Sequence, residues 1–325
     1  MLYASKKDGK MHKFKLASTS DKIWNRVELI NFLSKNQKKH IAIKMNPEAI
    51  CLNNLGLYDL IDCFDFAQVD LYTENPLEVH KKYNIIINNC SPWLGKKEVV
   101  NEQLHNWNNK KIFFCLFGRP TASRLGIAAH LYDNYNSISH LHFSATPIDD
   151  ELIQFELDKL LQYHIPSIKS AGELINNLPL LLSSPDRYTA FNGYYYDDPL
   201  TNFYQDILID IVVESHVAGN TFYPTEKTTR PMWLKKPFIT FASKDYLCYL
   251  RQMGFRTFND FWDEEYDGYE GRERYVKILQ LIDNISKKSK TELNDMYWEM
   301  KYTLDHNYDL LQTQSYNINN IEKII

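Results

Sequence analysis

The order of apolar and polar positions along this chain predicts strands and helices that alternate. Residues 111–117 and 207–213 are apolar runs, rich in aliphatic, β-branched and aromatic side chains. Mostly apolar runs of this length are typical of strands buried on both faces of a parallel sheet. A polar turn and a helix over residues 124–132 are predicted after the first run, and residues 238–241 form a third apolar run. The pattern therefore predicts an α/β domain in this part of the chain.

The first third of the chain shows the same alternation. Strands are predicted over residues 39–44, 69–72 and 84–87, with a helix over residues 55–62. This implies a second parallel sheet. From residue 290 onward, apolar side chains recur at helical spacing, which predicts one long helix. Its apolar positions are Leu293, Met296, Tyr297, Met300, Leu304 and Tyr308.

The length of the chain suits two domains of ordinary size, since 325 residues allow each to bury a core. The polar, charged stretch 106–110 is the expected crossing point between them. We therefore expect an α/β domain over residues 1–109, a second over residues 110–286 and a C-terminal helical segment over residues 287–325.

A helix start signal at Thr225 is the first candidate for chemistry. Thr225 can cap the helix, which leaves other first-turn N–H groups directed at an anion above the sheet. Lys227 adds a positive charge there, and the carboxylate of Glu226 suits the vicinal hydroxyls of a ribose. The three residues together suit a nucleoside diphosphate. An ordinary capped surface helix with an acidic first turn has the same local sequence, so the surrounding segments decide the interpretation.

The turn after residues 111–117 is the second candidate. Arg119 lies on this turn and Arg124 in the first turn of the following helix. A guanidinium in either position can bind a diphosphate through two parallel hydrogen bonds.

Several separated blocks, in this order, resemble the donor-binding half of a glycosyltransferase family found in large DNA phages and viruses. The resemblance covers roughly residues 205–285, and its Thr-Glu-Lys motif is similar to that of the α1,3-fucosyltransferases. The blocks are Glu214-Ser215, Thr225-Glu226-Lys227-Thr228, Arg230-Pro231, Lys236-Pro237-Phe238-Ile239, residues 250–258 and residues 261–267. Shorter blocks over residues 46–48, 56–59 and 72–80 resemble the amino-terminal region of the same proteins.

The resemblance implies a fold and an activity. It implies the GT-B plan, in which two Rossmann-like domains face each other across a cleft and the last helix packs back on the first domain. The expected activity moves a sugar from a nucleotide-sugar donor to an acceptor hydroxyl, with inversion of configuration. The first domain would be on the acceptor side. The donor would be bound by Arg119, Arg124, Glu214, Thr225, Glu226 and Lys227.

Sugar transfer also needs a group that takes the proton of the acceptor hydroxyl. Glu48 is our first candidate, because it follows a predicted strand and lies in a block that resembles the family. A role for Glu48 in capping the following helix is an equal alternative. Asp70, Glu78 and His80 are the reserve candidates.

The sequence does not predict a metal site or any other cofactor. It contains no Asp-x-Asp, the arrangement with which metal-dependent transferases chelate a divalent ion. Asp197-Asp198 is better explained as a turn before Pro199. His140 and His142 share one face of a predicted strand, and no acidic or cysteine ligand is near them in sequence. We expect cationic side chains to neutralise the departing diphosphate instead.

Charge and cysteine content describe the surroundings. A net charge of −4 gives no global field for nucleic acid. The cysteines are odd in number and lack C-x-x-C spacing, which favours reduced core thiols: Cys51, Cys63, Cys90, Cys115 and Cys248. Neither a signal peptide nor a run of transmembrane length is seen, so we expect a cytoplasmic protein with no membrane span.

Two other functions fit the same residues. One is a phage transferase that glycosylates hydroxymethylated bases in DNA, which predicts a basic face on the amino-terminal domain. The other is a non-catalytic protein that binds nucleotide sugars or glycans, for which Glu226, Lys227 or the arginines would be dispensable. The sugar, the base of the nucleotide and the acceptor, whether glycan or DNA, stay open.

Overall fold

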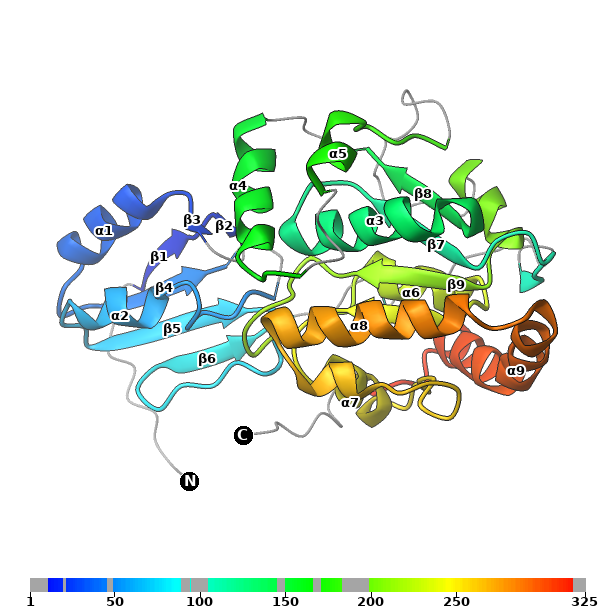
Figure 1. Ribbon diagram of the computed structural model, residues 1–325. Coiled ribbons are helices and arrows are strands. Elements are labelled where there is room, and N and C mark those ends of the chain that lie inside the picture. Colours follow the sequence, from blue (N-terminus) through cyan, green and yellow to red (C-terminus); the bar gives the residue numbers. More distant parts are fainter. Residues whose placement is uncertain are drawn as a thin grey trace. The chain divides into compact units, whose positions relative to one another are not determined.

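The computed structural model describes residues 11–19, 22–45, 49–88, 94, 105–144, 150–165, 171–182 and 199–317. The chain forms two compact units (Figure 1). The first unit comprises residues 1–91, 218–223 and 323–325, and the second comprises residues 92–217 and 224–322. The predicted boundary at residue 109 therefore lies inside the second unit. The return of residues 218–223 to the first unit was not indicated by any pattern in the sequence.

The described strands of the first unit form a parallel sheet in the order β1-β4-β5-β6. Their bounds are His12–Lys15 (β1), His40–Lys44 (β4), Gln68–Thr73 (β5) and Asn84–Ile87 (β6), and a short antiparallel pair joins Ser18–Thr19 (β2) to Lys22–Ile23 (β3). Helices α1 (Arg26–Lys35) and α2 (Leu57–Asp62) connect the strands. The sequence predicted β4, β5, β6 and α2 but missed β1.

One face of this sheet carries the core of the first unit. Ile41 and Ile43 of β4 lie beside Val69 and Leu71 of β5 and are almost completely buried. Right-handed crossovers that all run in one direction place their helices on the same face of a sheet. The buried side chains of both helices accordingly join this one cluster: Leu29 and Leu33 of α1 and Leu57, Tyr58 and Ile61 of α2. The side chains between the core positions point to the opposite face.

The second unit contains a parallel sheet in the order β10-β9-β7-β8. Its strands are Phe113–Phe117 (β7), Ser139–Phe143 (β8), Ile209–Val213 (β9) and Phe238–Phe241 (β10). All residues of β7, β9 and β10 are buried, as the apolar runs predicted. The described helices are Ala122–Tyr135 (α3), Asp150–Leu161 (α4), Ala171–Asn176 (α5), Glu226–Trp233 (α6), Tyr246–Gln252 (α7), Gly271–Ser286 (α8) and Lys290–Thr313 (α9), with 3-10 turns at Asn136–Ile138 (η2), Pro199–Gln205 (η5) and Glu265–Gly268 (η6).

The strand order of this second sheet contains a reversal. From β7 the chain adds β8 on one side, and it then returns to add β9 and β10 on the other. Helix α8 packs with α3 and β10, whereas α6 packs with β9 and α9, so helices cover both faces. In a doubly wound sheet, the loops at the carboxyl ends of the strands diverge where the order reverses, and ligands bind there. That point lies between β7 and β9.

The long C-terminal helix forms as the sequence predicted. Its start is fixed by a capping box, in which Ser289 and Glu292 bond each other's backbone N–H groups. The helix packs against α6 of the second unit. The hydroxyl of Tyr297 donates to the carbonyl of His105 at 2.7 Å. Both contacts lie within the second unit, and the packing of this helix back on the first domain stays a prediction.

Candidate functional site

The start of α6 is held by the carboxylate of Glu214, the residue that follows β9. This carboxylate accepts the backbone N–H of Thr225 at 3.0 Å and its hydroxyl at 2.5 Å. It also accepts the hydroxyls of Thr228 at 2.6 Å and Tyr246 at 3.1 Å. The Thr225 hydroxyl in turn accepts the backbone N–H of Lys227 at 3.2 Å, which confirms the predicted helix cap.

These contacts give Glu214 an internal role. Its side chain is buried, with 2 % of the residue exposed, and both carboxylate oxygens accept hydrogen bonds from the protein. The carboxylate joins the end of β9 to the start of α6. Direct binding of a donor by Glu214 stays a prediction, and these contacts favour a role in positioning the site.

Glu226 and Lys227 form an ion pair beside this cap. Lys227 Nζ lies 2.6 Å from Glu226 Oε1, with 16 % and 10 % of the respective side chains exposed. The same ammonium lies 3.4 Å from the hydroxyl of Ser215 and 3.3 Å from that of Thr225. Burial raises the pKa of Glu226, but the charge and hydrogen bond of Lys227 outweigh it, so the pKa lies below its ordinary value. Glu226 is therefore a carboxylate acceptor at neutral pH.

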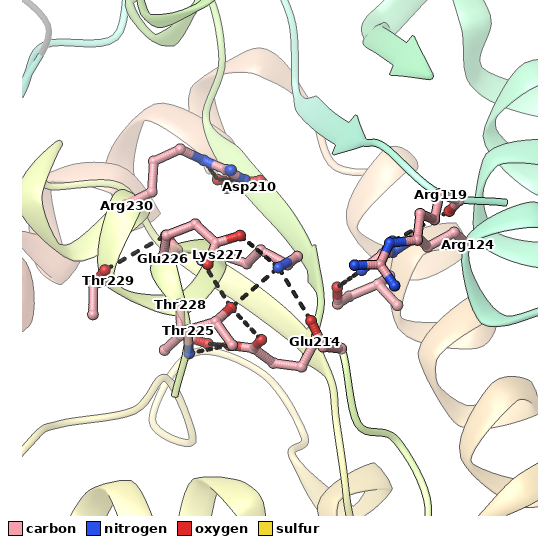
Figure 2. A network of polar contacts seen from close by, with 12 residues as sticks. Arg119, Arg124, Asp210, Glu214, Thr225, Glu226, Lys227, Thr228, Thr229 and Arg230 are labelled. Carbon is pink, nitrogen blue, oxygen red and sulfur yellow. Dashed lines mark hydrogen bonds and ion pairs between the residues drawn. The ribbon is translucent and has the colours of Figure 1, made fainter. Parts of the chain in front are cut away.

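The two arginines of the β7–α3 turn have different environments. Arg124 is 6 % exposed, and its guanidinium donates to the carbonyls of Arg119 at 3.2 Å and Val213 at 3.4 Å. It thereby links the ends of β7 and β9 at the reversal point. Arg119 is exposed, and its guanidinium makes no hydrogen bond or ion pair among the described residues. Figure 2 shows both arginines on one side of β9 and the residues of α6 on the other.

A carboxylate occupies the start of α3. The first N–H of this helix, that of Ala122, donates to Glu156 of α4 at 2.8 Å, and Thr121 makes no side-chain cap. A carboxylate at a helix N-terminus takes the position that a phosphate could take. Arg119 therefore offers the more accessible contact for an anion. A side-chain Cβ at neighbouring Gly118 would meet nothing within 4 Å, so the space beside it is open.

A buried cluster anchors α6 to β9. Arg230 Nη2 lies 3.1 Å from Asp210 Oδ2, and Tyr204 donates its hydroxyl to the same carboxylate while it accepts from Arg230 Nε. Asp210 is completely buried, which raises its pKa, and the positive charge of Arg230 opposes that rise. The sequence analysis quoted Arg230-Pro231 as a motif, and its structural role was not foreseen.

The acidic block over residues 261–267 supports the loops of the second unit. Asp267 accepts the backbone N–H groups of Leu247 and Cys248 at the start of α7. Glu264 accepts the N–H of Phe258 at 2.8 Å and pairs with Arg251 at 3.1 Å. These carboxylates therefore have partners in the protein and are poor candidates for catalysis.

The candidates for the acceptor side lie in the first unit. Glu48, our first candidate, falls outside the described residues. Glu78 is buried, and its carboxylate accepts the N–H of Leu52 at 3.1 Å and the hydroxyl of Tyr58 at 2.5 Å. The ring of His80 stacks with those of Tyr58 and Tyr83, with centroids at 4.2 Å and 4.6 Å. Glu78 and His80 are thus both in contact with other side chains of the first unit, and their role as a base stays a prediction.

The reserve candidate Asp70 is also hydrogen-bonded inside the first unit. Its carboxylate accepts from His40 at 2.8 Å, Gln68 at 2.9 Å and Asn84 at 3.1 Å. Burial raises the pKa of Asp70, but these hydrogen bonds outweigh it, so the pKa lies below its ordinary value. Asp70 is thus an ionised carboxylate at neutral pH, which orients the side chains around it.

The two histidines of β8 have separate partners. His140 Nε2 lies 3.3 Å from Asp206, and His142 Nδ1 accepts the N–H of Leu182 at 3.3 Å. Burial lowers the pKa of His142 to about 4. Over the parts of the chain with described positions, no group of three or more His, Cys, Asp or Glu side chains is placed to hold a metal ion. Asp197 and Asp198 lie outside those parts.

The described cysteines form no disulfide. Cys51, Cys63, Cys115 and Cys248 are free; Cys51 and Cys115 are buried, Cys248 is half-buried and Cys63 is exposed, while Cys90 is not among the described residues. None of the helices in the described ranges combines the length and the apolar character that crossing a membrane would need.

Fold and site together define a class of protein. The chain is a mixed α/β protein with two parallel sheets, the second wound in both directions, compatible with two Rossmann-like domains. Polar and charged side chains gather where the strand order of the second sheet reverses. Comparison with known proteins assigns no family, because no family model, curated protein or solved structure matches the chain.

Proposed function

We propose that the chain is a glycosyltransferase that uses a nucleotide-sugar donor, bound at the reversal point of the second sheet. One observation carries this proposal. The loop that follows β7 and the start of α6 bring Arg119, Glu226 and Lys227 to the carboxyl edge of one doubly wound sheet, where nucleotides bind in this arrangement. The resemblance of residues 205–285 to donor-binding domains agrees with it.

Each residue then has a role that follows from its environment. Exposed Arg119 and half-buried Lys227 would neutralise the diphosphate, and Glu226 would accept hydrogen bonds from the ribose hydroxyls. Thr225 caps α6, while buried Glu214 and Arg124 hold the two loops in place. The ammonium of Lys227 contacts Glu226, Ser215 and Thr225, so a diphosphate would have to replace one or more of these contacts to bind it.

The residue that takes the proton of the acceptor hydroxyl is proposed from the sequence alone. We propose Glu48 as the base, which predicts that Glu48→Gln lowers kcat about 10²- to 10⁴-fold and leaves donor affinity nearly unchanged. Near-normal turnover would move the role to another residue. We also propose that transfer inverts the configuration of the sugar and needs no metal ion. Loss of transfer in EDTA that is restored by manganese would contradict independence from metal ions.

Calorimetry with UDP, GDP, CMP and dTDP, and with their sugars, tests donor binding. We expect one nucleotide to bind, and Arg119→Ala and Lys227→Ala each to weaken its affinity about tenfold or more, as for a lost charge-assisted hydrogen bond. Arg26→Ala and Lys288→Ala are matched controls, because both side chains are exposed and lie on α1 and just after α8. Failure of every nucleotide to bind, or unchanged affinity in both site variants, would contradict the proposed function.

A further inference from the structure

The face of the first sheet that lies opposite its core carries a cluster of exposed lysines. Phe14 and Leu16 belong to the core, so Lys13 and Lys15 of β1 point to the opposite face. Lys44 points the same way, since Ile43 and Met45 are in the core. The strand register aligns Lys15 with Lys44 and Lys44 with Tyr72. We call Lys13, Lys15, Lys44 and Tyr72 the lysine face.

The three lysines are close together and exposed. Residues two apart on a strand are separated by about 6.6 Å, and aligned residues on neighbouring strands by about 4.8 Å. All three lysines are exposed, and Tyr72 is half-buried. The row through Lys13 passes along the sheet through Ala42 and the carboxylate of Asp70 to Asn84.

No carboxylate among the described residues pairs with these ammonium groups. Within the described ranges, the side chains of Lys13, Lys15 and Lys44 take part in no ion pair or hydrogen bond. Many other lysines of the chain are paired with acids: Lys82 with Asp62, Lys110 with Asp206, Lys159 with Glu156, Lys227 with Glu226, Lys235 with Asp305 and Lys277 with Glu265. Like charges at this spacing repel each other, and an anionic ligand would relieve that repulsion.

Asp70 lies on the same face of the sheet as the three lysines. It is aligned with Ala42, two strands away from Lys13 and on the strand next to Lys44. Its carboxylate accepts hydrogen bonds from His40, Gln68 and Asn84, and the residue is 5 % exposed. Asp70 is therefore engaged with these three side chains, and among the described residues it forms no ion pair with the lysines.

The sequence of the first unit also carries more positive than negative charges, unlike the rest of the chain. Residues 1–91 contain 13 Lys and Arg against 10 Asp and Glu, whereas the rest of the chain contains 24 against 31. The overall charge of −4 thus hides a first unit with excess positive charge. A local field of this kind attracts polyanions even when the total charge is negative.

We propose that the lysine face binds nucleic acid, with the three ammonium groups on phosphates and the ring of Tyr72 against a base. An aromatic ring among cations is the combination with which proteins hold a nucleic-acid strand without reading its sequence, and an acidic polysaccharide has no base to stack on it. If the proposed function holds, the acceptor is a nucleic acid. That last step rests on the proposed function; binding itself does not.

Fluorescence anisotropy with a labelled 20-nucleotide single strand and a 20-base-pair duplex tests binding between 50 and 200 mM salt. We expect the variant Lys13→Gln, Lys15→Gln, Lys44→Gln to bind about tenfold or more weakly at 50 mM salt, and the slope of log affinity against log salt to fall by roughly 2 to 3. Tyr72→Leu should weaken the single strand several-fold and the duplex little. Lys35→Gln on α1 is the matched control, because it removes an exposed lysine of the same unit from the opposite side of the sheet.

Three results would overturn the proposal. They are no binding of either nucleic acid by the wild-type chain, a triple variant with the affinity and salt slope of the control, or equal binding of polygalacturonate with the same sensitivity to the triple variant. Nucleotide calorimetry on the same proteins separates this proposal from the donor site. The triple variant should keep wild-type nucleotide affinity, and Arg119→Ala and Lys227→Ala should keep nucleic-acid affinity. Nucleic-acid binding without nucleotide binding would contradict the proposed function alone.

Discussion

The guanidinium of Arg124 joins the ends of two strands at the point where the second sheet reverses its order. Because it donates to the carbonyls of Arg119 and Val213 from a buried position, we expect its loss to affect stability before ligand binding. Arg124→Ala should lower the free energy of unfolding by about 1 to 3 kcal/mol, as for buried acceptors that lose their donor. Urea unfolding of Arg124→Ala beside Arg119→Ala measures this. Equal, near-wild-type stability of both variants would contradict it.

We expect the buried Lys236 to make the free energy of unfolding depend on pH. It is fully buried, its Nζ donates to the carbonyl of Asn106 at 2.8 Å, and burial lowers its pKa to about 7 while Asp206 opposes the shift. Between this value and about 10.4, the ordinary pKa of lysine, the unfolded chain holds a proton that the folded chain lacks, so the free energy of unfolding rises with pH. Below pH 7 both states are protonated, and the full cost of the buried charge remains.

Lys236→Met removes this titration and provides the reference. We expect the stability of the wild type relative to Lys236→Met to increase by up to roughly 2 kcal/mol from pH 7 to pH 9, since a unit of pKa shift corresponds to about 1.4 kcal/mol. Denaturant unfolding of both proteins at pH 7, 8 and 9 measures it, and the difference cancels the titration of other groups. A constant difference would show that the lysine is charged inside the fold.

At the scale of elements, α6 is attached to β9 by the buried pair of Arg230 and Asp210. Arg230→Met leaves a completely buried carboxylate with Tyr204 as its remaining described partner, so we expect a loss of about 3 to 5 kcal/mol in the free energy of unfolding. Replacing both members, Arg230→Met with Asp210→Leu, should recover part of that loss. Lys277→Met, which breaks an exposed pair with Glu265, should cost less than about 1 kcal/mol.

Thermal unfolding of the wild type, Arg230→Met, the double variant and Lys277→Met tests these expected losses of stability. A double variant no more stable than Arg230→Met would show that the unpaired charge of Asp210 is not what destabilises Arg230→Met. Since the first turn of α6 carries Glu226 and Lys227, Arg230→Met should also weaken nucleotide binding in a folded variant.

The sequence predicted those elements whose own residues determine them. Strands β7, β9 and β10 are mostly apolar runs, and α6 begins at a Thr with the side-chain cap that its position implies. Strand β1 was missed because its four residues, His-Lys-Phe-Lys, bury little of their own surface and gain their place by pairing with β4.

The chemistry of the site was harder to predict than its location. Arg119, Lys227 and Glu226 lie where the motifs placed them, at the ends of the strands of one sheet. The internal roles of Glu214 and Arg124 depend on contacts with residues 11 and 89 positions away in the chain, and the contact of Glu156 with Ala122 spans 34 positions. Periodicity and local motifs contain no information on such pairs. The sequence treated all the donor-binding candidates alike. The exposure of each side chain, which the fold determines, separates Arg119 and Lys227 from the buried Glu214 and Arg124.

At the scale of the whole molecule, the chain leaves the second unit after Val217 and re-enters it at Pro224. The segment between belongs to the first unit. There Asn75, which is fully buried, donates to the carbonyl of Asn220 at 2.8 Å and accepts the N–H of Phe222 at 3.3 Å. Gly219 has a φ of +77°, and a Cβ built on it would lie 2.2 Å from Nδ2 of Asn54. Both the backbone and the space therefore require glycine there.

This shared segment decides how the protein can be divided experimentally. A fragment that stops near residue 91 would lack part of its own interior, including Phe222, and would expose the polar groups of Asn75 that the segment satisfies. A fragment that starts near residue 92 would carry the same six residues as a loop without its packing partner. We therefore expect neither piece to fold on its own, and the lysine face and the candidate nucleotide site are best studied in one polypeptide, by substitution and not by truncation.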